Sequence, residues 1–165
     1  MDALTEMAGG IGALLKEKGA TVAVAESSAG GLISASLLVV PGASAYFLGG
    51  GVVYTRTARR ALLDLPEQVI TMNAGSEEYA LILARAVRDR FEADWGLCET
   101  GATGPTGSRY GHDAGHCCVA VAGPVERAIT LETRIAARES NMWRFAETAL
   151  RLLEETVRES GLEPS

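Results

Sequence analysis

Hydrophobic residues along the chain follow two alternating patterns. In some segments apolar side chains recur every three to four residues, the spacing that places them on one face of a helix. Between these segments, short runs of apolar and β-branched residues are typical of buried strands. The helical pattern covers residues 2–18, 32–40, 58–63, 76–90 and 139–159. The strand pattern covers residues 21–25, 46–54, 95–99, 116–122 and 127–133.

This alternation predicts an α/β fold, a three-layer α/β/α sandwich formed by a single domain over residues 1–165. The last two strands meet at Gly123-Pro124, which predicts a hairpin, so we expect a mixed, mostly parallel sheet. Apolar residues make up 47% of the chain, enough for a sizeable core. Ser76 precedes Glu77 and Glu78 and is expected to cap its helix.

Charge and cysteine content narrow the range of partners. The formal net charge is −6 with scattered basic residues, whereas a nucleic-acid-binding protein carries a basic stripe. No apolar run reaches the roughly 20 residues of a membrane span. The three cysteines, two of them adjacent, form no disulfide framework. We therefore expect a cytoplasmic protein without nucleic-acid or membrane partners.

Two loops rich in Ser, Thr and Gly follow buried strands. Residues 27–31 (SSAGG) connect a strand to a helix, and residues 100–107 (TGATGPTG) follow another strand. Such loops can direct free N–H groups toward an anion. The first loop has neither Walker A nor GxGxxG spacing, and alone it could equally be a tight packing turn. Because open α/β sheets bind ligands beyond the carboxyl ends of their strands, the two loops together predict a pocket for a phosphorylated small molecule.

The chain resembles the C-terminal domain of the CinA (competence/damage-inducible protein) family. The resemblance lies in residues 25–33 (AESSAGGLI), 40–50 (VPGASAYFLGG), 53–54 (VY) and 100–105 (TGATGP), and in Arg138, which matches an arginine opening the last helix. Stand-alone members of the family are nicotinamide mononucleotide deamidases. The resemblance therefore implies a stand-alone enzyme that hydrolyses the nicotinamide carboxamide to nicotinic acid mononucleotide and ammonia.

The resemblance also implies roles for individual residues. Ser27 would be the nucleophile, with Tyr54 beside it, and Arg59 would occupy the place of a catalytic family lysine. Substrate contacts, including a glycine-rich cradle for the phosphate, would come from Ser28, Gly30, Gly31, Thr100, Gly101, Gly104 and Arg138. Neither a metal nor another cofactor is implied. Family members assemble as dimers or larger, so we expect a homodimer or larger homo-oligomer.

This sequence departs from the family pattern in two places. The usual loop reads Glu-Ser-Cys-Thr-Gly-Gly, whereas Ser28 and Ala29 stand here in place of cysteine and threonine. Arg59 stands in place of the lysine that acts as a base. Arginine cannot be deprotonated in a protein, so it can orient an anion but cannot take a proton from Ser27. The two lysines of the chain, Lys16 and Lys18, both lie on the first predicted helix.

Other groups near the second loop offer alternatives. His112 or His116 could act as the base, because histidine titrates near neutral pH. Alternatively, His112 is an exposed loop residue and His116 a strand-end residue. Cys117 and Cys118 are adjacent on a strand and point to opposite faces, which disfavours a metal site. Cys98, in a predicted strand, is interpreted as a small core residue.

Three functional hypotheses follow. The first is a nucleotide amidohydrolase with Ser27 as the nucleophile. The second is a catalytically degenerate nucleotide-binding or partner module that has lost its base. The third is an amide hydrolase with a different substrate. From the sequence alone, Tyr54 could equally be a core aromatic and Arg138 an exposed residue at a helix start. Only the family resemblance assigns them to the site.

Overall fold

A five-stranded mixed sheet forms the middle of the molecule. The computed structural model describes residues 1–161. The strands are β1 (Val22–Glu26), β2 (Phe47–Val52), β3 (Trp95–Gly101), β4 (His116–Ala122) and β5 (Arg127–Glu132), in the order β2-β1-β3-β4-β5. The first three pair in parallel, and β4 is antiparallel to both its neighbours. All strands except β4 thus run the same way, which confirms the predicted mixed, mostly parallel sheet.

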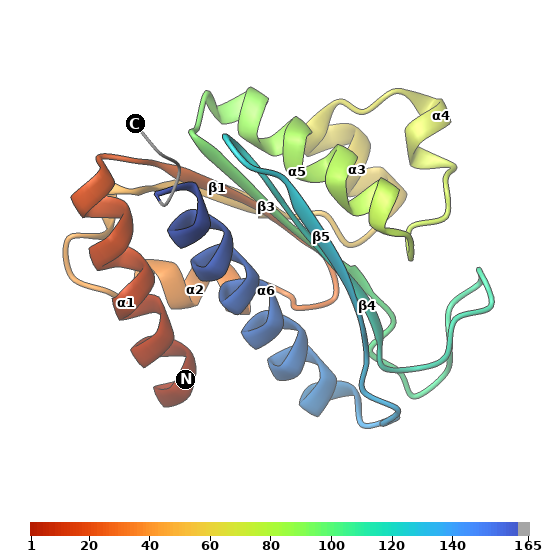
Figure 1. The fold of residues 1–165 in the computed structure, drawn as a ribbon. Helices are drawn as coiled ribbons and strands as arrows, with labels where there is room; N and C mark the ends of the chain where they lie inside the picture. The colour runs from red at the N-terminus through yellow and green to blue at the C-terminus, as the bar shows by residue number, and fades with distance from the viewer. Residues whose placement is uncertain (162–165) are drawn as a thin grey trace.

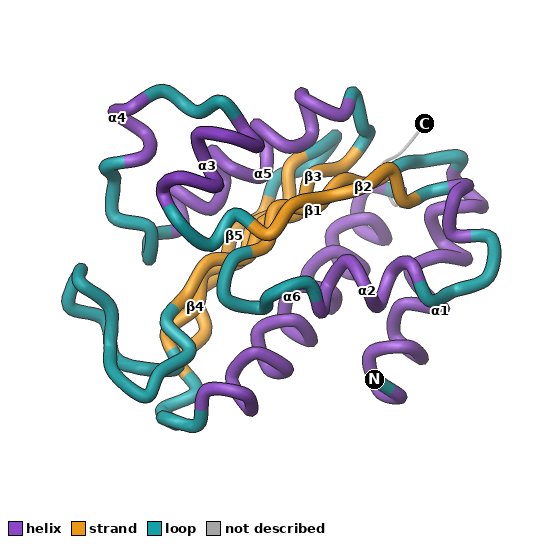
Figure 2. The backbone as a smooth tube through the Cα atoms, turned by 180° about the vertical axis from the view of Figure 1, so that it is seen from behind, coloured by secondary structure: helices purple, strands orange, loops and turns teal. Residues whose placement is uncertain are grey.

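Helices cover both faces of this sheet. They are α1 (Asp2–Lys18), α2 (Leu32–Leu38), α3 (Arg56–Leu63), α4 (Glu67–Ile70), α5 (Glu77–Phe91) and α6 (Arg138–Ser160), with a short 3₁₀ turn, η1 (Ala43–Ala45). Figures 1 and 2 show α1, α2 and α6 on one face and α3, α4 and α5 on the other. The three-layer α/β/α architecture is therefore confirmed. None of the helices in residues 1–161 is both long enough and apolar enough to cross a bilayer.

The core consists of two apolar layers, one on each face of the sheet. Trp95 and Cys117 belong to the layer under α1, α2 and α6, whereas Cys98 and Cys118 belong to the layer under α5. The adjacent cysteines thus point to opposite faces, as the strand alternation predicts. All three cysteines are free and buried, and Cys98 is the core residue that the sequence indicated.

Two local features follow directly from residue type. The Ser76 hydroxyl accepts a hydrogen bond from the Tyr79 N–H at 3.1 Å, so the predicted cap of α5 is present. In β2, a Cβ atom on Gly50 would lie 2.5 Å from the Val24 carbonyl oxygen, so a residue without a side chain is needed for the close pairing with β1. The pattern of apolar positions missed α4 and η1, because elements this short carry no measurable periodicity.

Strand β3 is longer than the sequence indicated. Thr100 and Gly101 continue the antiparallel ladder opposite Cys118 and Cys117 instead of belonging to a loop. The loop between β3 and β4 therefore begins at Ala102, and we call residues 102–115 the β3–β4 loop. Thr100 and Gly101, the first two residues of the second predicted loop, are therefore held in the sheet.

Candidate active site

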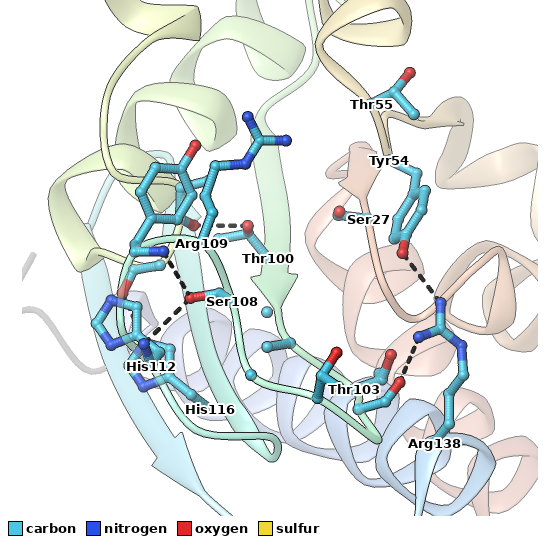
Figure 3. A pocket seen from close by; sticks show the side chains of 18 of the residues that line it. Ser27, Tyr54, Thr55, Thr100, Thr103, Ser108, Arg109, His112, His116 and Arg138 are labelled. Atoms are coloured by element: carbon cyan, nitrogen blue, oxygen red, sulfur yellow. Dashed lines mark hydrogen bonds between the residues drawn. The ribbon is translucent and has the colours of Figure 1, made fainter. Parts of the chain in front are cut away.

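A cavity of about 390 Å³ lies beyond the carboxyl ends of β1 and β3. This is the place where open α/β sheets bind ligands, and the volume suits a small nucleotide. Its walls come from Ser27 after β1, the segment joining β2 to α3 with α3 itself, residues 74–75 before α5, the end of β3 with the β3–β4 loop, and the first residue of β4. Arg138, at the start of α6, closes one side (Figure 3).

Ser27 brings a nearly buried hydroxyl to this cavity. The residue is 5% exposed and follows directly after β1. Its backbone N–H donates to Glu99 Oε2 at 2.9 Å, which fixes the residue against the neighbouring strand. Within residues 1–161 the Ser27 hydroxyl has no hydrogen-bond partner, and the residue lines the cavity. The hydroxyl is therefore available to a ligand.

Two buried glutamates hold the loop that carries Ser27. Glu26 and Glu99 are neighbours in the β1–β3 register, and neither is exposed. The Glu99 carboxylate accepts the Ser27 and Ala29 N–H groups, each at 2.9 Å, and the Ser28 hydroxyl at 2.5 Å. This loop is thus anchored from the adjacent strand.

The Glu26 carboxylate occupies the start of α2. It accepts the N–H groups of Gly31, Ile33 and Ser34 at 2.8, 3.1 and 2.9 Å, and also the Ser34 hydroxyl at 2.7 Å. The N–H groups at a helix start have no acceptor within the helix. Here the Glu26 carboxylate is the anion that accepts them. Each N–H group of residues 31–34 therefore already donates to an acceptor of the chain itself.

These contacts correct the expectation that the first glycine loop cradles a phosphate. Ser28, Gly30 and Gly31 do not line the cavity. The Gly31 N–H donates to Glu26, the Gly30 N–H to the Ser27 carbonyl, and the Ser28 hydroxyl to Glu99. The loop serves instead to hold Ser27 in place.

Burial shifts the pKa of Glu99 and of two buried thiols. Desolvation raises the pKa of Glu99 above its ordinary value, and the neighbouring Glu26 adds to the rise, although three hydrogen bonds to the carboxylate oppose it. Desolvation also raises the pKa of the Cys98 and Cys117 thiols. Since the thiolate is the reactive form, these two cysteines are inert core residues.

Tyr54 and Arg138 meet at the cavity mouth. Arg138 Nη2 donates to the Tyr54 hydroxyl oxygen at 3.0 Å, and Arg138 Nη1 donates to the Gly104 carbonyl oxygen at 2.6 Å. Tyr54 is 50% exposed, so it is not a core aromatic. The bond to Tyr54 joins residues 84 positions apart in sequence, and the bond to Gly104 ties the β3–β4 loop to the start of α6 (Figure 3).

Arg59 points from α3 into the cavity wall. It is 7% exposed, and its Nε and Nη2 donate to the carbonyl oxygens of Val53 and Tyr54 at 3.1 and 3.2 Å. Its guanidinium carbon lies 5.6 Å from the ring centre of Tyr79. No carboxylate in residues 1–161 forms an ion pair with it. A nearly buried cation therefore has only neutral partners.

Further arginines give the cavity a cationic wall. Arg56, Arg109 and Arg138 also line it, and none of the lining residues is acidic. The Nε atom of Arg56 is buried and has no hydrogen-bond partner in the described chain. Cationic walls of this kind concentrate anionic ligands. Sequence reasoning missed Arg56 and Arg109, because arginines are scattered along the chain and only the fold brings these together.

The end of β3 and the β3–β4 loop are fixed by hydrogen bonds to neighbouring elements. The Thr100 hydroxyl donates to the Ala74 carbonyl oxygen at 2.7 Å, and the Asn141 side chain donates to the Thr103 carbonyl oxygen at 2.9 Å. Thr100, Gly101 and Gly104 all line the cavity. Gly104 has a φ of 102°, a conformation that favours glycine. These three predicted substrate contacts therefore share one surface.

The two histidines form a stacked pair away from Ser27. Their ring centres are 3.8 Å apart and the ring planes differ by 3°. His116, 6% exposed, contacts Glu132 through Nδ1 and the Gly75 carbonyl oxygen through Nε2, so both ring nitrogens are occupied and it is a strand-end residue. His112 lines the cavity, but Figure 3 shows it on the opposite side from Ser27. The structure therefore does not bring either imidazole to the serine.

Known protein families include one that matches nearly the whole chain. The family model described as the CinA C-terminal domain matches residues 4–157.

The chain belongs to the CinA family.

Curated CinA relatives are longer than this chain. A CinA-like protein of Gloeobacter violaceus is 41% identical over 133 residues, which are 79% of this chain and 31% of that protein. A putative competence-damage inducible protein of Halothermothrix orenii is 38% identical over 141 residues, 84% of this chain and 34% of that protein. The chain thus spans about a third of the length of these relatives.

Solved CinA structures share the fold along nearly the whole chain. The competence/damage inducible protein CihA of Agrobacterium tumefaciens superposes with a TM-score of 0.86 at 28% identity, covering 93% of this chain and 94% of that one. A CinA superfamily protein of Klebsiella pneumoniae gives a TM-score of 0.87 at 22% identity, covering 94% and 98%. The second likeness shows the fold alone.

In this CinA domain the fold gathers part of the predicted site. Ser27, Tyr54, Arg59, Thr100, Gly101, Gly104 and Arg138 line one cavity. The sequence did not reveal the anchoring role of Glu26 and Glu99, although an acidic residue at or near the end of each of two buried strands was a usable signal. Within residues 1–161, no group of three or more His, Cys, Asp or Glu side chains is arranged to hold a metal ion.

Proposed function

We propose that this CinA domain is an amidohydrolase that converts nicotinamide mononucleotide to nicotinic acid mononucleotide and ammonia, with Ser27 as the nucleophile. The observation that supports this most is the Ser27 hydroxyl, unpartnered within residues 1–161, in a cavity whose walls carry arginines and no acid. A serine fixed by its backbone hydrogen bond can attack an amide carbon. The cationic wall beside it attracts the phosphate of the same ligand.

In the proposed reaction, Ser27 Oγ attacks the carboxamide carbon. The C–N bond then breaks, and the nitrogen leaves as ammonia after gaining the serine proton. Water hydrolyses the resulting ester, releasing the acid and restoring the serine. Tyr54 is the residue we assign to pass the serine proton to the leaving nitrogen, since its segment leaves β2 alongside that of Ser27. The Val53 N–H donates to the Glu26 carbonyl oxygen at 2.7 Å, which holds the two segments together.

The phosphate of the ligand belongs, in this proposal, to the arginine-lined part of the cavity. The first glycine loop is already occupied by Glu26 and Glu99. Arg109 of the β3–β4 loop and Arg138 reach the cavity from two other directions. Planar guanidinium groups bind phosphate oxygens in pairs, so these side chains can neutralise the ligand without a metal ion.

An ammonia-release assay with nicotinamide mononucleotide tests the activity. We expect release by the wild-type protein and none by Ser27→Ala, which should keep the native melting temperature. Thermal shift with the substrate, with and without chelator, tests binding separately, since a ligand that binds only the folded state raises the melting temperature. Absence of ammonia release despite tight binding would exclude the activity.

One observation favours a second candidate, a nucleotide-binding or partner module without catalysis. Arg59 stands where the family resemblance expects a lysine, and its guanidinium is held by two backbone carbonyls. An arginine there binds an anion but takes no proton. Ligand-induced stabilisation of both wild type and Ser27→Ala, with no ammonia from either, would favour this module. Release of ammonia from another amide alone would indicate a different substrate.

A further inference from the structure

We infer that the cavity binds the carboxylate form of its pyridine nucleotide more tightly than the carboxamide form, and that Arg59 discriminates between them. The inference rests on the proposed function and deepens it. Its consequence is regulatory: the acid product of the reaction competes with the amide substrate for the same cavity.

The first support is the missing counter-ion of Arg59. Charged groups that are nearly buried are usually paired with an opposite charge, because desolvation is costly. Arg59 is 7% exposed, yet the partners within residues 1–161 are two carbonyl oxygens and an aromatic ring. Arg56, three residues earlier on the same helix, adds a second cation with a buried, unpartnered Nε. A bound anion would supply the negative charge that these two cations lack within residues 1–161.

The second support is the position of this cation relative to Ser27. Arg59 donates to the Val53 carbonyl oxygen, and the Val53 N–H donates to the Glu26 carbonyl oxygen, one residue before Ser27. The reacting carbon must lie at Ser27 Oγ. Ser27 and Arg59 line the same cavity, so in this inference the oxygens on that carbon face the Arg59 side of the wall.

The third support is the charge change in the reaction itself. Amide and acid nucleotides carry the same ring, ribose and phosphate, and differ only in that the acid adds one negative charge. No acidic side chain lines the cavity, and the Glu99 carboxyl group behind Ser27 is already engaged by three hydrogen-bond donors of the loop. A hydrogen bond between two charged groups is about twice as strong as a neutral one, so we expect the acid to bind about tenfold more tightly or better.

The test measures binding by calorimetry in the Ser27→Ala background, where no turnover occurs. The probes are nicotinamide mononucleotide and nicotinic acid mononucleotide, together with the corresponding ribosides, which lack phosphate. We expect the acid to bind at least about tenfold more tightly within both pairs. Adding Arg59→Gln should reduce the acid preference to about twofold or less.

Arg60→Gln is the matched control, because Arg60 lies on the same helix but pairs with Glu67 outside the cavity. It should leave the acid preference unchanged. If Ser27→Ala binds the acid nucleotide no more tightly than the amide nucleotide, the inference is overturned, whether or not Arg59→Gln folds. If Arg59→Gln weakens both nucleotides equally and leaves the ribosides unaffected, Arg59 binds phosphate and the inference is wrong.

The ammonia assay separates this inference from the proposed function. Wild-type release of ammonia with no acid preference in binding overturns the inference alone. An acid preference lost in Arg59→Gln, without any ammonia release, supports the assignment of Arg59 and refutes the activity. Binding of neither nucleotide overturns both.

Discussion

The backbone N–H of Ser27 donates to the carboxylate of Glu99 across 72 residues of sequence. The candidate nucleophile therefore depends on the neighbouring strand as much as on its own loop. Because the same carboxyl group also accepts the Ala29 N–H and the Ser28 hydroxyl, one buried side chain sets the conformation of the segment.

Removing that carboxylate should unfold or loosen the Ser27 loop. In Glu99→Ala, three buried donors lose their acceptor, and we expect a loss of about 2–4 kcal/mol in the free energy of unfolding. Glu99→Gln keeps an oxygen for the two N–H groups and offers an NH₂ to the Ser28 hydroxyl, so it should cost much less. Chemical denaturation of both variants checks this. Equal losses for Ala and Gln would mean that the charge, not the hydrogen bonding, holds the loop.

The raised pKa of Glu99 makes its contribution depend on pH. The folded state binds the proton more tightly than the unfolded state, so this stability is fully present below the unfolded pKa of about 4.3 and is lost as pH rises through the folded pKa. The free energy of unfolding of wild type minus that of Glu99→Gln should therefore fall as pH rises from about 4 to 7. A flat difference would show that Glu99 has an ordinary pKa.

Particular residues show what the sequence could reveal. Ser76 as a helix cap, the hairpin at Gly123-Pro124 and the buried strand of Cys98 depend on neighbours in sequence, and all three were predicted. The phosphate cradle at Gly30 and Gly31 was wrong, because the Glu26 carboxylate accepts the Gly31 N–H and the Ser27 carbonyl oxygen accepts the Gly30 N–H, contacts that arise only in the folded loop.

Site residues were predictable from the sequence only where they belong to a recognisable motif or match a family position. Ser27 lies within a recognisable loop motif, and Tyr54 and Arg138 matched family positions. Their mutual hydrogen bond, and the presence of Arg56 and Arg109 in the same wall, result from long-range packing. No local pattern encodes which scattered arginines converge.

Arg138 should matter for ligand binding more than for folding. Its side chain is exposed and holds Tyr54 and Gly104, so Arg138→Ala should change the free energy of unfolding by less than about 1 kcal/mol. Nucleotide affinity should fall about tenfold, because a cation and the anchor of the β3–β4 loop are both lost. Calorimetry and thermal unfolding measure the two effects. Arg144→Ala, an exposed arginine on the same helix outside the cavity, is the control and should change neither. Unchanged affinity with a large loss of stability would make Arg138 structural.

The stacked histidines should make the protein sensitive to mild acid. Burial lowers the pKa of His112, and the neighbouring His116 lowers it further, while Glu132 opposes both. Because the folded state binds this proton less tightly, the contribution is present above the unfolded pKa of about 6.5 and is lost as pH falls through the folded pKa. The melting temperature of wild type relative to His112→Gln should therefore fall between about pH 7 and 5. If the two proteins respond identically to acid, another group is responsible.

Arg59→Lys tests whether the missing base limits the reaction. A lysine there would be nearly buried and would have Arg56 on the same helix, and both conditions lower the pKa of an ammonium group. It could then take the proton from Ser27, which arginine cannot do. We expect ammonia release from nicotinamide mononucleotide to rise by about 10²-fold or more, the usual worth of general-base assistance.

The gain must depend on the nucleophile, so Ser27→Ala combined with Arg59→Lys should release no ammonia. Arg60→Lys, on the exposed side of the same helix, should leave the rate at the wild-type value. A fast wild type that is slowed by Arg59→Lys would mean that a base is already present. His112 would be the residue to replace next, although the fold places it across the cavity from Ser27 (Figure 3). If wild type and Arg59→Lys bind the nucleotide and neither releases ammonia, restoring the lysine does not restore catalysis. The domain then acts by binding alone.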